Sequence, residues 1–112
     1  MRDGIYRVDF KPGSSNGYGI AMVRSGVFKG VDQDRVYFGE FTVREGRITG
    51  HIGFQQYLTR LQPSFGISGS TVNLEGRETE NGFELTGESE AEPKSRYRIQ
   101  GKRIAGLSEP TR

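Results

Sequence analysis

The chain has 112 residues, of which 32% are hydrophobic and 17 are glycine, and it carries 16 basic and 14 acidic residues. This length supports one domain with one core, and a net charge of +2 without a clustered basic patch argues against a nucleic-acid-binding protein. The chain has no cysteine, which excludes disulfides, thiolate metal sites and cysteine nucleophiles.

The first half of the chain alternates apolar and polar residues with a period of two, which predicts β-strands. Tyr6, Val8 and Phe10 fall on one face of the first strand, and a loop at 12–17 follows it. Ser25-Gly26 predicts a tight turn. The strands of this half are predicted at residues 5–11, 18–24, 27–30 and 35–43.

The second half continues this pattern after a hairpin turn at Glu45-Gly46. Its strands are predicted at residues 47–55, 70–77, 83–88 and 95–104. Residues 57–69 break the alternation, and we expect either a short helical turn or a lid there. The barrel domain is predicted to cover residues 1–105, with a disordered or frayed tail at 106–112.

Five glycines favour closure of these strands into a barrel. Each lies in the inward register, two residues after a large apolar residue: Gly39, Gly50, Gly76, Gly87 and Gly101. Inward glycines permit tight coiling and leave space inside a small barrel. The sequence therefore predicts an all-β fold, an eight-stranded antiparallel up-and-down barrel of the lipocalin-like kind. Alternatively, the glycines only relieve crowding and leave no usable cavity.

Candidate catalytic groups are scarce. His51, the single histidine, falls on the outward face, and neither a second histidine nor a cysteine accompanies it. The carboxylates fall on outward positions or loops, and the serines have no histidine partner. We therefore expect no enzymatic activity, no catalytic residue, no metal and no cofactor.

The sequence also indicates where the protein acts. No window approaches the roughly 18 apolar residues of a membrane helix, and the N-terminal residues contain no apolar signal core. We therefore expect a cytoplasmic protein that contacts neither membrane nor nucleic acid.

Several short motifs, in their order and spacing, resemble the GrlR-like family, small bacterial proteins named for a negative regulator of type III secretion gene expression. The likeness covers residues 3 to 87, and the motifs are Asp3-Gly4-Ile5-Tyr6, Gly17-Tyr18-Gly19-Ile20, Gly30-Val31-Asp32, Tyr37-Phe38-Gly39, Ser64-Phe65-Gly66-Ile67 and Val72-Asn73-Leu74-Glu75-Gly76. The resemblance implies an eight-stranded lipocalin-like barrel that forms homodimers and has an apolar interior.

The resemblance also implies a role in regulation, because the named regulator sequesters a DNA-binding transcriptional activator through an acidic Glu-Asp-Glu-Asp surface stretch. The corresponding positions here are Val43-Arg44-Glu45-Gly46, which keep one acid and add a base. The role of that acidic stretch is therefore not carried over to this chain.

Two hypotheses about function follow. The first is a regulatory interaction module that forms a homodimer and binds a protein partner, a transcriptional regulator, with a candidate surface at Gly19, Ala21, Val23 and Phe38. The second is a carrier or sensor of a small apolar molecule. Its candidate lumen is lined by Tyr6, Phe10, Tyr37, Phe41, Ile52, Phe54, Leu74 and Leu85.

Overall fold

The structure is a computed structural model that describes residues 1–11, 18–33, 35–56, 71–89 and 96–108. The predicted lid or helical turn at 57–69 lies outside the described residues, as does the last part of the predicted tail. The strands are β1 (Gly4–Lys11), β2 (Tyr18–Arg24), β3 (Val27–Val31), β4 (Arg35–Arg44), β5 (Arg47–Gln56), β6 (Thr71–Thr79), β7 (Gly82–Ser89) and β8 (Arg96–Ala105).

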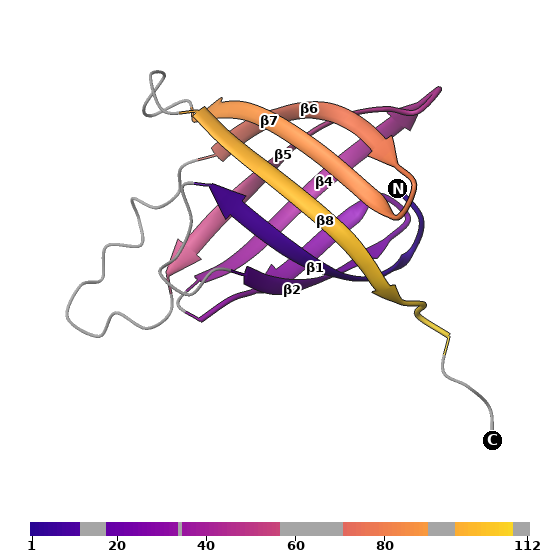
Figure 1. Ribbon diagram of the computed structural model, residues 1–112. Helices are drawn as coiled ribbons and strands as arrows, with labels where there is room; N and C mark the ends of the chain where they lie inside the picture. Colours follow the sequence, from indigo (N-terminus) through magenta and orange to yellow (C-terminus); the bar gives the residue numbers. More distant parts are fainter. Residues whose placement is uncertain (12–17, 34, 57–70, 90–95, 109–112) are drawn as a thin grey trace.

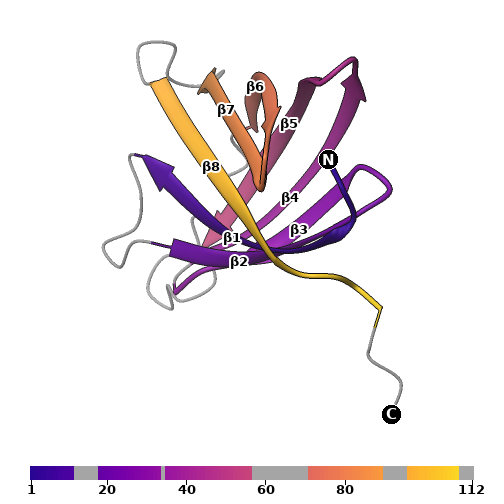
Figure 2. The ribbon, with the colours of Figure 1, turned by 45° about the vertical axis from the view of Figure 1, so that its right-hand side comes forward.

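These strands form one closed antiparallel barrel in which each strand pairs with its sequence neighbours and β8 pairs with β1. Figures 1 and 2 show the single layer of strands wrapping around the interior, with β2 and β3 on one side and β6 and β7 on the other. The predicted all-β, eight-stranded antiparallel barrel is confirmed. The predicted strand ends differ from the observed ones by at most two residues, and both ends of β2 coincide.

Two tight turns set the register of the first half of the barrel. Ser25 and Gly26 have φ angles of 51° and 83°, and Glu45 and Gly46 have φ angles of 53° and 81°. Two consecutive residues with positive φ are the signature of the hairpin turn whose twist matches that of the flanking strands. The tight turns predicted at these two positions are therefore confirmed.

The core fills the inside of the barrel with alternate residues from all eight strands. Every second residue of β1, β2 and β4 is buried over most of the strand, which explains the period of two in the sequence. The buried apolar side chains are Tyr6, Val8, Phe10, Ala21, Val23, Phe28, Tyr37, Phe41, Ile48, Ile52, Val72, Leu74, Phe83, Leu85 and Ile99.

Glycine is required at Gly50, where strands β4 and β5 approach closely. Gly50 lies opposite Phe41, and a β-carbon at this position would overlap the carbonyl oxygen of Glu40 and the ring of Phe41. Gly53, on the same strand, has nothing within 4 Å of the place that a β-carbon would occupy. The two glycines of β5 therefore have different roles.

We expect Gly50→Ala to lower the free energy of unfolding by about 1–3 kcal/mol, because the added methyl group forces the sheet or the Phe41 ring to move. Gly53→Ala is the matched control, and it should be neutral or stabilise by up to about 1 kcal/mol, because it only restricts the unfolded chain. Urea-induced unfolding followed by circular dichroism measures both. Equal stability of the two variants would contradict the conclusion that glycine is required at position 50, where β4 and β5 approach closely.

Candidate functional site

The barrel interior contains the residues predicted to line a lumen. Seven of the eight are buried, and Phe54 is partly buried and packs against the core. The rings contact one another: the centroids of Phe10 and Tyr37 are 4.6 Å apart, and those of Phe10 and Phe54 are 5.5 Å apart. The predicted inward orientation is confirmed, and these rings pack against one another inside the barrel.

Four cavities lined by described residues lie on the outside of the barrel or at its rim. One of about 120 Å³ lies at the end of the barrel beside Tyr6 and Arg103. The other three, of about 480, 320 and 400 Å³, are hollows lined mainly by outward-facing side chains of β5–β8, β3–β5 and the β7–β8 region. A molecule that bound in one of these four hollows would therefore contact the outer surface or the rim of the barrel.

An ion pair at one end of the barrel was not predicted from the sequence. The Arg35 guanidinium donates to Asp32 Oδ2 at 3.0 Å, and the Arg35 backbone N–H donates to Asp32 Oδ1 at 2.9 Å. The Asp32 side chain is 2% exposed and that of Arg35 is 17% exposed. The signal was present in the sequence as an acid and a base three residues apart, but period-two alternation does not indicate burial of either one.

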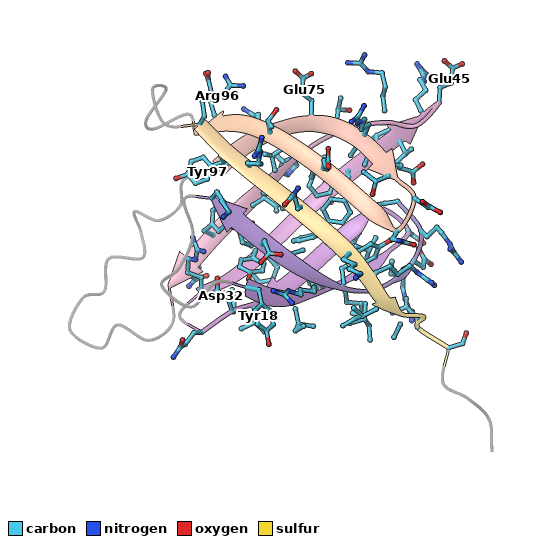
Figure 3. The ribbon with its side chains drawn as sticks, viewed as in Figure 1. Tyr18, Asp32, Glu45, Glu75, Arg96 and Tyr97 are labelled. Carbon is cyan, nitrogen blue, oxygen red and sulfur yellow. The ribbon has the colours of Figure 1, made fainter. Side chains whose placement is uncertain are left out.

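Aromatic rings surround the arginine of this pair. The Arg35 guanidinium carbon lies 5.4 Å from the centroid of the Phe10 ring and 5.1 Å from that of Phe54. Phe54 in turn stacks on Tyr97, with centroids 6.2 Å apart. Figure 3 shows Asp32 and Tyr97 at the same end of the barrel. Among the described residues, this end of the core therefore contains a cation that lies over two aromatic rings.

At the other end of the core, Tyr6 keeps its hydroxyl buried and satisfied. The hydroxyl donates a hydrogen bond to the carbonyl oxygen of Arg2 at 2.6 Å. Burial raises the pKa of the Tyr6 phenol, and the positive charges of Arg103 and Arg2 offset only part of that effect. The neutral phenol is thus the form that the fold favours.

Three of the four predicted interaction-surface residues point inward, which corrects that prediction. Gly19, Ala21 and Val23 are buried. A β-carbon at Gly19 would overlap the hydroxyl of Tyr37. Gly19 therefore leaves room for Tyr37, and the three residues face the interior, where a second barrel cannot contact their side chains.

Phe38 is exposed as expected, and it lies within a larger apolar surface. Six of the eight exposed large hydrophobic residues in the described part of the chain point outward from three adjacent strands. We call them the β2–β4 outer face: Tyr18, Ile20, Met22, Val27, Val31 and Phe38. Strand pairing joins them, since Ile20 lies opposite Val31. Sequence reasoning missed this face because it assigned the wrong side of β2 to the surface.

The predicted surface position of His51 is confirmed. Its side chain is exposed and lies on β5 directly opposite Glu40 on β4. Among the described residues, no group of three or more His, Cys, Asp or Glu side chains is arranged to hold a metal ion. The part of the chain that the structure describes also contains no helix long and apolar enough to cross a membrane.

The positions that correspond to the acidic stretch of the GrlR-like family lie at the β4–β5 hairpin. Arg44 and Arg47 flank its turn and face each other across the two strands, and Arg77 on β6 lies opposite Arg47. This tip therefore carries a row of three arginines, of which only Arg44 belongs to Val43-Arg44-Glu45-Gly46, the stretch that the resemblance aligns with the acids.

Comparison of the sequence with known proteins adds no assignment: no family model matches the chain, and no curated protein matches it.

We expect Asp32→Asn to lower the free energy of unfolding by about 3 kcal/mol, because it leaves a mostly buried arginine without its counter-charge. The amide can still accept the Arg35 backbone N–H, so only the charge is removed. The double variant Asp32→Asn with Arg35→Met should be more stable than Asp32→Asn alone. Thermal unfolding of both variants measures this, and a neutral Asp32→Asn would contradict the role of the pair.

Alkaline pH should destabilise the protein through Tyr6. In the unfolded chain the phenol ionises near pH 10, whereas in the folded state its pKa is raised. Its contribution is therefore complete below about pH 10 and is lost as the pH rises toward the higher pKa of the folded state. Tyr6→Phe should cost about 1 kcal/mol at neutral pH, through the lost hydrogen bond, and should weaken the alkaline loss.

The control for Tyr6 is Tyr18→Phe, because Tyr18 is 49% exposed. Denaturant unfolding measured from neutral pH to about pH 11 compares the alkaline slope of Tyr6→Phe with those of the parent protein and of Tyr18→Phe. An unchanged slope in Tyr6→Phe would show that Tyr6 does not carry the effect.

Proposed function

We propose that the protein is a non-enzymatic regulatory module of the GrlR-like kind, which forms a homodimer through its β2–β4 outer face and acts on a protein partner, a transcriptional regulator. The proposal includes a cytoplasmic location, where such a regulator of bacterial transcription would act. The barrel in the structure has the architecture that the resemblance implies.

The clustering of exposed apolar side chains is the observation that carries the proposal. Single exposed hydrophobic residues are normal on a monomer, whereas a contiguous group marks a contact surface. Phe38 is 52% exposed and Tyr18 is 49% exposed, and aromatic residues are enriched at protein interfaces. These exposed apolar side chains share the outward side of three adjacent strands, where Lys29 lies between Met22 and Phe38.

The same face has features that suit a second copy of itself. Beside Phe38 lies a hollow of about 320 Å³ lined by Val27, Lys29, Phe38, Glu40 and His51. In a two-fold dimer each feature of a surface meets the same surface of the other subunit. An aromatic ring next to a hollow, and a lysine near a glutamate, allow such a surface to complement itself.

The packed interior weighs against the alternative function, a carrier of a small apolar molecule. Fifteen apolar side chains are buried in the described part of the barrel, and the aromatic rings among them contact one another. An eight-stranded barrel has a lumen that side chains can fill completely. A carrier would need several of these rings to move before a ligand could enter.

Sedimentation velocity over a range of protein concentrations tests the homodimer. The parent protein should sediment as a dimer, and Phe38→Ser should raise the dimer dissociation constant by about ten-fold or more, as loss of a central aromatic residue does at interfaces. Val43→Ser is the matched control, because Val43 is exposed at the end of β4 in the inward register, outside the β2–β4 outer face.

A monomeric parent protein at every concentration would overturn the homodimer. Equal weakening by Phe38→Ser and Val43→Ser would instead reject the β2–β4 outer face as the contact surface. Circular dichroism spectra of both variants should match that of the parent, since both side chains are exposed.

A further inference from the structure

A second surface, on strands β5–β8, has the opposite chemistry. It contains a hollow of about 480 Å³ lined by Arg47, Arg77 and Arg98, with Glu75, Glu84, Thr86 and Gln100 between them. We call this hollow the arginine groove. Figure 3 shows Glu75 and Arg96 pointing outward on the β6–β8 side, whereas Tyr18 points outward from β2 on the far side.

Two arginines that line one end of this groove, Arg47 and Arg77, face each other, and Arg44, beside the groove on β4, faces Arg47. Arg44, Arg47 and Arg77 occupy directly opposed positions on β4, β5 and β6. Like charges at directly opposed positions destabilise a sheet. Among the described residues, the ion pair found for these three arginines joins Arg77 to Glu84, at 3.8 Å between two largely exposed side chains.

A similar arrangement occurs at the other end of the groove. Arg98 on β8 lies opposite Lys11 on β1 and opposite Thr86 on β7. Neither basic side chain makes an ion pair within the described residues. Repulsion at both ends of one groove is relieved when an anion binds, and guanidinium groups match carboxylates through two parallel hydrogen bonds.

We infer that the arginine groove binds an acidic, extended segment of a partner protein. Neighbouring strands are about 4.8 Å apart, so the arginines on them form a row of positive charges across the sheet. Carboxylates along an extended peptide can bind to this row. Glu75 and Glu84 lie between those cations and would repel a nucleic-acid strand, which carries a charge at every nucleotide. A peptide can place neutral residues opposite them.

This inference rests on the proposed function, which includes a protein partner, and it adds the chemistry of the segment by which that partner binds. The groove lies on β5–β8 and the proposed dimer contact on β2–β4, so the two surfaces can be tested separately. Figure 2 shows β2 and β3 on the opposite side of the barrel from β6 and β7, whereas β4 and β5 are neighbours.

The test is binding of a fluorescently labelled synthetic peptide that alternates glutamate with serine, followed by anisotropy with the full-length chain. The parent protein should bind it saturably, and less tightly as the ionic strength rises to about 0.15 M. Arg47→Gln combined with Arg77→Gln should weaken binding by about ten-fold or more, because two charge-assisted contacts are lost. A peptide with glutamine in place of glutamate should not bind.

The matched control is Arg7→Gln combined with Lys102→Gln, a directly opposed basic pair on β1 and β8. This control removes two positive charges, as the groove variant does, but at positions outside the groove. We expect the affinity for the peptide to change by less than about two-fold, because salt screens charges that are far from the bound peptide. Phe38→Ser should leave peptide binding unchanged even where it abolishes the dimer, so failure of one proposal is distinguishable from failure of the other.

Three outcomes would overturn the inference: absence of saturable peptide binding, equal weakening by the two double variants, or tighter binding of a labelled single-stranded oligonucleotide than of the peptide. Thermal unfolding of both double variants at or above the temperature of the parent protein ensures that a loss of binding reports on the groove, since each variant removes an opposed pair of like charges.

Discussion

Closing eight strands into a ring fixes the space inside the barrel, and the rest of the structure depends on how the side chains fill that space. β8 pairs with β1, so each strand of the ring has a neighbour on both sides. The same closure separates each strand into residues that face the interior and residues that face outward. Aromatic residues from several strands meet in the middle, and glycine is required where two strands approach closely, as at Gly50.

The aromatic core also limits which polar groups can lie at the two ends of the barrel. At one end the aromatic layer finishes against Arg35, whose charge is balanced by Asp32 and whose flat guanidinium group lies near two rings. At the other end the hydroxyl of Tyr6 meets a backbone carbonyl. At both ends a hydrogen bond lets a polar side chain border the apolar core, through one terminal nitrogen of Arg35 and through the hydroxyl of Tyr6. Arg35 Nε, by contrast, is buried without a hydrogen bond among the described residues.

The outer surface is divided into two kinds of face. The β2–β4 outer face is apolar and suits contact with a second barrel, whereas the arginine groove on β5–β8 is rich in opposed positive charge. A homodimer built on the first would leave the second accessible on each subunit. The proposed regulatory module would then carry two copies of the groove, so that a partner with two acidic segments would bind more tightly than its single contacts allow.

The sequence by itself determined the fold class and most of the strands, because alternation and turn residues are local signals. The inward positions of Tyr6, Phe10 and Tyr37 followed from the same alternation. It did not decide which side of β2 faces outward: Gly19, Ala21 and Val23 are small, and their strand neighbours Ile20 and Met22 are large, so hydrophobicity favoured the wrong side.

Only the tertiary structure decided the assignment of β2, because the volume available to Gly19 depends on Tyr37, which β4 contributes. The same reason applies to the row of Arg44, Arg47 and Arg77 and to the Asp32–Arg35 pair. Register between strands brings distant charges together, and burial of an ion pair depends on the rings around it. Neither is a property of a residue and its near neighbours in the chain.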